Sequence, residues 1–123
     1  MLDHVTLAVR DLSRSRSFYD RALAPLGIER LYSEGMTFLG YGVRPKAFFW
    51  IGLRAAEATG AHVAFAASSR AAVDAFHEAA LAGGGHDNGA PGLRQHYHAS
   101  YYSAFALDPD GHNIEAVCHD PRG

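Results

Sequence analysis

The sequence is poor in cysteine and carries little net charge, and both features narrow the possible functions. Cys118 is the single cysteine among 123 residues, so an internal disulfide framework is excluded and we expect a reducing, cytoplasmic location. The formal net charge of -2 gives no reason to expect nucleic acid or an anionic membrane as a partner. No apolar run approaches the length of a membrane span, and strand-like sequence from Leu2 onward leads us to expect no signal peptide.

The composition is that of an ordinary globular domain. Hydrophobic residues make up 48%, charged residues 20% and aromatic residues 11% of the chain, which argues against disorder. A chain of 123 residues can bury a core without disulfides or metals. We therefore expect a single domain over residues 1–123. The eight histidines are many for this length, and each is weighed separately.

A repeat with a shift of 58 residues divides the domain into two modules. With this shift His4 falls on His62 and Phe18 on Phe76, without a gap. Such a self-match indicates one supersecondary unit used twice. We expect module 1 to span about residues 1–57 and module 2 about residues 58–123, each with the order strand, helix and three strands.

The periodicity of the apolar residues places these elements. Those of module 1 are expected at about residues 2–9, 14–24, 28–33, 36–42 and 47–53. Those of module 2 are expected to be a strand from residue 62, a helix at about 70–82 and strands at about 99–107 and 113–119. Residues 83–97 are glycine-rich and are expected to be mostly irregular, with room for one short strand.

Three polar side chains, His4, His62 and Glu115, interrupt apolar strands. A carboxylate on a half-buried strand is costly unless it is paired, hydrogen-bonded or bound to a metal. Each of the three lies opposite the large aliphatic residues of its strand, so we expect all three on one polar face. Two histidines and one carboxylate are a recurring ligand set for a divalent metal. The sequence thus predicts a metal site, which would suit Zn²⁺, Ni²⁺, Mn²⁺ or Fe²⁺.

The repeat and four stretches of sequence resemble the vicinal oxygen chelate superfamily, which includes glyoxalase I, fosfomycin and bleomycin resistance proteins and extradiol dioxygenases. The four stretches are residues 3–12, 18–27, 61–66 and 105–117. The resemblance implies an α+β fold of two tandem βαβββ modules that form a cup-shaped, curved mixed sheet with the helices outside. It also implies that His4, His62 and Glu115 stand at the places of metal ligands. In many short members two chains build each site, so we expect a homodimer in which His4 of one chain meets His62 and Glu115 of the other.

The sequence departs from the glyoxalase I pattern at the fourth ligand. Many glyoxalase I enzymes have an acidic ligand on the last strand of the first module, but residues 47–53 contain none. Glu57 is in register with Glu115 by the shift of 58, yet its neighbours resemble a loop, and a solvated carboxylate is the preferred interpretation. Three ligands would leave positions on the metal open for substrate oxygens.

The sequence also departs from the extradiol dioxygenases. His98 has an acceptable spacing for their active-site histidine, but Phe105 stands where they have a tyrosine, and it cannot donate a hydrogen bond. Tyr101 or Tyr102 could supply a hydroxyl group instead. A bulged five-residue turn before the last strand would put Tyr101 on the Glu115 face, whereas a four-residue turn would put Tyr102 there. The family pattern favours Tyr101.

The favoured function is a divalent-metal-dependent enzyme acting on a small molecule with adjacent oxygen atoms. A glyoxalase-like lyase or isomerase is preferred over a ring-cleaving dioxygenase. The predicted catalytic residues are Glu115, His98 and Tyr101, and the predicted substrate-binding residues are Trp50, Phe49, Tyr102 and Phe105. One alternative is a metal-free protein that binds a planar or cationic drug, as bleomycin resistance proteins do; another is a scaffold with a degenerate site.

Of the other histidines, His119 could line the rim of the cup, His96 is a poorer candidate, and His77, His86 and His112 are expected at the surface.

Overall fold

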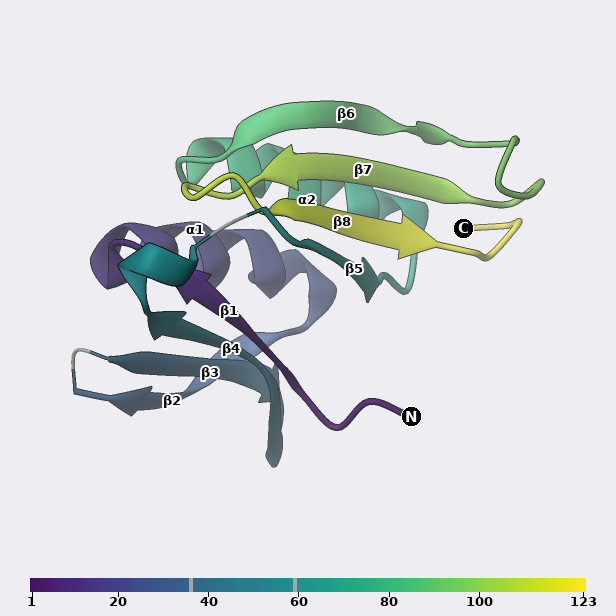
Figure 1. Ribbon diagram of the computed structural model, residues 1–123. Helices are drawn as coiled ribbons and strands as arrows, with labels where there is room; N and C mark the ends of the chain where they lie inside the picture. Colours follow the sequence, from purple (N-terminus) through teal and green to yellow (C-terminus); the bar gives the residue numbers. More distant parts are fainter. Residues whose placement is uncertain (36, 59) are drawn as a thin grey trace.

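The protein repeats one unit of strand, helix and three strands, as seen in a computed structural model that describes residues 1–35, 37–58 and 60–123 (Figure 1). The elements of the first unit are β1 (Val5–Val9), α1 (Leu12–Leu23), the 3-10 turn η1 (Ala24–Leu26), β2 (Glu29–Glu34), β3 (Phe38–Val43) and β4 (Lys46–Leu53). Those of the second are β5 (His62–Ala66), α2 (Arg70–Ala82), β6 (His86–Leu93), β7 (Tyr102–Leu107) and β8 (Asn113–Cys118), preceded by the 3-10 turn η2 (Ala55–Glu57). The α+β class and the two βαβββ modules are confirmed.

Several elements differ from the expected boundaries, among them β7, which begins at Tyr102 rather than at residue 99. Strand β1 begins at Val5 rather than at residue 2, and the stretch expected to be mostly irregular contains the eight-residue strand β6. Strand β6 pairs with β7 in an antiparallel register that is interrupted twice, between Asp87 and Gly89 and between Gly89 and Gly92. Interruptions of this kind bend a strand and hide its period from the sequence.

Both helices begin at side-chain caps that the sequence supplies. Asp11 accepts a hydrogen bond from the backbone N–H of Arg14 at the start of α1, and Ser69 does the same for Ala72 at the start of α2. These caps satisfy N–H groups that the first turn of a helix leaves without a partner. After α1 and η1 the chain turns at Gly27, whose φ of 76° is the left-handed conformation that glycine adopts most readily.

Each module forms its own four-stranded sheet, in the orders β1-β4-β3-β2 and β5-β8-β7-β6. The first strand of each module runs parallel to the last, with Thr6 beside Trp50 in one sheet and Ala64 beside Glu115 in the other. Equivalent positions in the two first strands, Thr6 and Ala64, are 58 residues apart, but equivalent positions in the two last strands are not. The counterpart of Glu115 in module 1 is therefore Trp50 and not Glu57, which agrees with the preferred interpretation of Glu57 as a solvated carboxylate. Glu57 is an exposed residue in η2.

The helices cover one face of the two sheets and leave the other face open. Figure 1 shows α1 and α2 behind the sheets, and the two helices also pack against each other. The core between helices and sheets contains fully buried residues from both modules, among them Phe18, Phe49, Phe76 and Ile114. Removal of this apolar area from water is the main contribution to folding. No helix among the residues that the structure describes is both long and apolar enough to cross a membrane.

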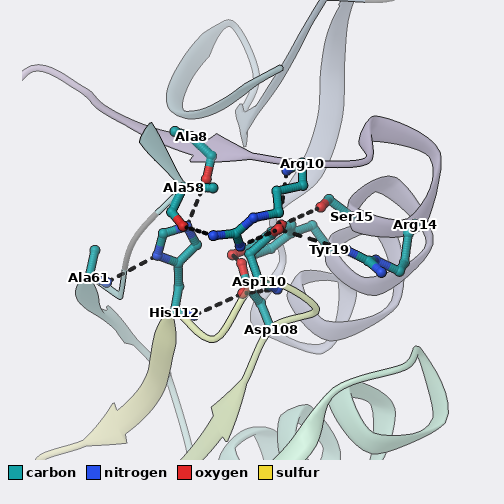
Figure 2. A network of polar contacts seen from close by, with 10 residues as sticks. All are labelled: Ala8, Arg10, Arg14, Ser15, Tyr19, Ala58, Ala61, Asp108, Asp110 and His112. Carbon is teal, nitrogen blue, oxygen red and sulfur yellow. Dashed lines mark hydrogen bonds and ion pairs between the residues drawn. The ribbon is translucent and has the colours of Figure 1, made fainter. Parts of the chain in front are cut away.

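The turn between β7 and β8 joins the two modules through a polar network (Figure 2). Asp108 in this turn accepts a buried hydrogen bond of 2.6 Å from the hydroxyl group of Tyr19 on α1. The Asp110 side chain is fully buried and accepts hydrogen bonds from the backbone and the guanidinium group of Arg10 and from the Ser15 hydroxyl. Charge-assisted and buried hydrogen bonds of this kind are the stronger ones in proteins.

His112, at the end of the same turn, is 2% exposed, so its predicted place at the surface is wrong. Its Nε2 donates to the carbonyl oxygen of Ala8 on β1 at 2.7 Å, and its Nδ1 accepts from the backbone N–H of Ala61 at 3.0 Å. One neutral imidazole thus connects the strand that follows His4 to the residue that precedes His62. This contact fixes the two first strands relative to each other.

Candidate functional site

The candidate site is built around Glu115, whose side chain is 2% exposed and lies on the open face of the second sheet. Its Oε1 is 2.9 Å from Nε2 of His62, which comes from the neighbouring strand β5. Its Oε2 accepts a hydrogen bond of 2.5 Å from the hydroxyl group of Tyr101. Both carboxylate oxygens are therefore paired, as a buried carboxylate requires.

Tyr101 reaches Glu115 because of the register of the last hairpin. Phe105 lies directly opposite Glu115, and five residues separate β7 from β8. Side chains at alternate positions share a face, so the predicted orientation of Tyr101 toward Glu115 is confirmed. Burial is the main cause, and the hydrogen bond to Glu115 the second cause, of a rise in the pKa of Tyr101 to about 12. The phenol therefore stays protonated near neutral pH and acts as a donor.

A pair of imidazoles lies beside Tyr101. His98 Nε2 is 2.7 Å from His119 Nδ1, and His98 Nδ1 accepts from the backbone N–H of Ser100 at 3.2 Å. Both rings contact the Tyr101 ring edge to face, with centroids 5.4 and 5.2 Å away. Because both ring nitrogens of His98 are engaged, His98 could act as a base only after giving up one of these contacts. Its catalytic role stays a prediction.

Glu115, His62, Tyr101 and His98 lie at the wall of an open cavity of about 600 Å³ on module 2. Its lining residues are His62, His96, Tyr97, His98, Tyr101, Phe105 and Glu115. The predicted catalytic residues and Phe105 are thus brought together. His96 and Tyr97 were not selected from the sequence as site residues, because the loop that holds them has no periodicity from which their direction could be inferred.

The open face of module 1 is different. His4 and Trp50 line a separate cavity of about 300 Å³ together with Thr6, Tyr32 and Phe38. The Trp50 ring lies against Gly40, where an added Cβ would come within 2.6 Å of it. The side chain of His4 is 56% exposed and its ring contacts Asp3 at 2.9 Å.

Two of the predicted substrate-binding residues lie on the helix side of the sheets. Phe49 is fully buried and packs against Tyr19 and Phe65, with ring centroids 5.0 and 5.1 Å away. Tyr102 donates to Asp74 on α2 at 2.6 Å. Neither residue lines the cavity beside Glu115, since successive residues of a strand point to opposite faces.

The donors at the site suit a borderline divalent metal. An imidazole nitrogen and a carboxylate oxygen face each other at the wall of an open cavity, and both are ligands that Zn²⁺, Ni²⁺, Mn²⁺ and Fe²⁺ accept. Within one copy of the chain, the described residues contain no group of three or more His, Cys, Asp or Glu side chains placed to hold one ion. The prediction that a second chain supplies His4 stays a prediction.

Comparisons with known proteins agree with this architecture. The model of the Glyoxalase/Bleomycin resistance protein/Dioxygenase superfamily matches residues 1–116. A glyoxalase/bleomycin resistance protein from Albidiferax ferrireducens T118 is 32% identical, with 98% of this chain and 99% of that chain covered and a TM-score of 0.82.

A family enzyme from Burkholderia phytofirmans PsJN shares the fold at 22% identity, with 96% and 98% of the two chains covered and a TM-score of 0.74. A glyoxalase/bleomycin resistance protein from Catenulispora acidiphila DSM 44928 shares it at 19% identity, with 96% and 98% covered and a TM-score of 0.69. No curated protein matches the chain.

Proposed function

We propose that this chain, which belongs to the Glyoxalase/Bleomycin resistance protein/Dioxygenase superfamily, is a divalent-metal-dependent enzyme acting on a small molecule with adjacent oxygen atoms. The observation that carries the proposal is the contact of 2.9 Å between the imidazole of His62 and the buried carboxylate of Glu115 at the wall of an open cavity. A glyoxalase-like lyase or isomerase is favoured. A ring-cleaving dioxygenase is less favoured because Phe105, directly opposite Glu115, has no hydroxyl group.

His62 and Glu115 would hold the metal, with His4 of a second chain as the third ligand in a homodimer. The metal would supply Lewis-acid polarisation of the adjacent substrate oxygens. In the metal-free form a proton lies between His62 Nε2 and Glu115 Oε1. That hydrogen has to move, to Nδ1 of the same ring or to another acceptor, before Nε2 can become a ligand.

The protein groups around this pair have separate roles in the proposal. The Tyr101 hydroxyl donates to Glu115 Oε2 and fixes the direction of the carboxylate. A partner that orients a ligating carboxylate in this way commonly tunes a metal site. The Phe105 ring lies 6.1 Å from the His62 ring and gives the cavity an apolar wall.

A metal-free binding protein is the second candidate, and one observation favours it. Both oxygens of Glu115 already have hydrogen-bond partners from this chain, His62 and Tyr101. The carboxylate therefore needs no metal to compensate its burial. In this alternative the cavity binds a small molecule without transforming it.

Elemental analysis of the purified protein separates the two candidates. We expect near one divalent metal ion per chain, and a loss of most of it in His62→Ala and Glu115→Gln because each variant removes a ligand. His86→Ala is the matched control, since His86 is an exposed histidine on β6 away from the cavity. A protein that stays metal-free after incubation with Zn²⁺, Ni²⁺, Mn²⁺ and Fe²⁺ would contradict the proposal of a metal-dependent enzyme and favour the metal-free binding protein.

The shared site is tested by mixing two variants. His4→Ala and His62→Ala should each lose the metal alone, but in a mixed dimer one of the two sites would keep every ligand. We therefore expect metal binding to recover in part when the two are unfolded together and refolded. No recovery, or retention of metal by His4→Ala, would place the third ligand elsewhere.

A further inference from the structure

Among the residues that the structure describes, the polar groups that line the module 2 cavity are imidazoles, phenols and one carboxylate. Glu115 is the single carboxylate among the described residues of this lining, and both of its oxygens are already engaged. The other polar groups of the lining are the imidazoles of His62, His96 and His98 and the hydroxyl groups of Tyr97 and Tyr101. Tyr97 is 57% exposed and the His62 side chain is 53% exposed, so both are accessible.

The hydrogen bonds of His98, which lines the cavity, and of its partner His119 have a fixed direction. The backbone N–H of Ser100 donates to Nδ1 of His98, so a neutral His98 carries its proton on Nε2 and donates it to Nδ1 of His119. His119 then carries its own proton on Nε2. The chain of hydrogen bonds that starts at Ser100 therefore ends in another N–H group and not in an acceptor.

One positively charged side chain also lies next to the cavity. The guanidinium group of Arg94 lies over the ring of Phe105, 5.5 Å from its centroid, and that ring lines the cavity. Arginine remains charged at every physiological pH. A cationic ligand would find no free carboxylate among the described lining residues, so charge complementarity favours an anion.

We infer that this cavity takes a small organic anion, a carboxylate with an adjacent oxygen such as an α-hydroxy acid, and that the N–H group of His119, held in place by His98, and the guanidinium group of Arg94 form its anion-recognising rim. The adjacent oxygen rests on the proposed function, whereas the preference for an anion does not. The donors of the rim would bind carboxylate oxygens, and His62 and Glu115 lie next to the second oxygen.

Calorimetric titration of chelator-treated protein with two molecules of nearly equal shape tests the inference. Mandelate carries a carboxylate beside its hydroxyl group, and mandelamide carries a neutral amide in the same place. We expect mandelate to bind about tenfold more tightly, as one charge-assisted contact would give. Equal affinities, or a preference for the cation 2-amino-1-phenylethanol, would overturn the inference.

Variants of the rim show which groups carry the preference. His119→Gln and Arg94→Gln should each reduce the ratio of the two affinities, whereas Arg94→Lys, which keeps the charge, and His86→Gln, outside the cavity, should keep it. An unchanged ratio in both rim variants would overturn the assignment of the rim. Thermal unfolding of each variant confirms that it is folded before its affinities are compared.

The outcome is independent of the metal. If the protein binds no metal but still prefers mandelate, the proposed enzyme fails and the anion site stands. If metal binds through His62 and Glu115 while mandelate and mandelamide bind equally, the enzyme stands and the anion site fails.

Discussion

The two modules share a backbone plan, but their open faces bear different chemistry. Trp50 on β4 pairs with Thr6, and Glu115 on β8 pairs with Ala64, so the two residues occupy the same place in their sheets. In module 1 that place holds an aromatic ring over a glycine, and in module 2 it holds a buried carboxylate with two partners. The comparison shows that the repeat duplicated the scaffold without duplicating the site. Function has to be read from the side chains at each position.

The helix-facing sides of the sheets differ as well. In module 1 this side is filled by large fully buried rings, including Tyr41 and Phe49. In module 2 the corresponding strands present the buried alanines Ala104, Ala106 and Ala116. Small side chains allow α2 to pack closely on β6, β7 and β8, whereas the space under α1 is filled by rings. A smaller side chain should therefore destabilise module 1, and a larger side chain should destabilise module 2.

The largest expected effect comes from changing those volumes. Phe49→Ala removes a fully buried ring and should lower the free energy of unfolding by about 3–5 kcal/mol, because the aromatic cluster cannot collapse into the cavity left behind. Ala116→Leu adds volume where α2 has no room and should cost about 1–3 kcal/mol. Urea unfolding followed by circular dichroism measures both. A tolerated Ala116→Leu would show that the helix of module 2 can move away from its sheet.

The second-largest change in the free energy of unfolding is expected at the hydrogen bond between Tyr19 and Asp108, which connects the modules. Tyr19→Phe removes the buried donor to Asp108 and should cost about 1–3 kcal/mol near pH 7, because an oxygen of the buried carboxylate loses its partner. Burial, reinforced by Asp108, raises the pKa of the Tyr19 phenol well above its usual value. The folded protein therefore keeps this proton when the unfolded chain loses it above about pH 10, and stability declines as the pH rises further.

Replacement of Tyr19 by phenylalanine should remove the part of this loss of stability at alkaline pH that the Tyr19 proton causes. The difference between wild type and Tyr19→Phe in the free energy of unfolding should therefore shrink between pH 8 and pH 10.5. Tyr97→Phe serves as the control because Tyr97 is 57% exposed. A difference that is constant over this range would contradict the buried, protonated Tyr19.

Much of the fold could be predicted because its signals are local. The helix expected at residues 70–82 has those bounds, since Ser69 supplies its cap and its apolar residues recur at helical spacing. Strand β6 was expected only as a short strand in an irregular stretch, because Asn88, Gly89 and Pro91 have low strand propensity. It forms because β7 supplies the pairing partner, which is a contact that local sequence does not encode.

The candidate site, like the fold, could be predicted from the sequence only where the signal is local. Alternation within strands was enough to put His62 and Glu115 on one face, whereas the choice of Tyr101 over Tyr102 depended on the turn length that the family pattern favours. It could not show that His112 is buried against the other module, because its partners Ala8 and Ala61 lie far away in the chain. The same limit applies to Trp50 as the counterpart of Glu115. That relation depends on strand pairing, and a shift of the sequence by a fixed number of residues cannot give it.

The smallest expected effect concerns the two histidines that the repeat superposes. His62 is held by the buried Glu115, whereas His4 is held by Asp3, whose side chain is 69% exposed and also contacts Lys46 at 2.7 Å. The hydrogen bond from Lys46, followed by the one from His4, lowers the pKa of Asp3, but exposed ion pairs contribute little because water and salt screen them. Asp3→Asn should therefore leave the urea midpoint of a dilute sample unchanged at pH 7. A clear loss that grows with protein concentration would mean that this segment is covered in solution. A second copy of the chain bound over His4 would have that effect, and it is the arrangement that the shared metal site requires.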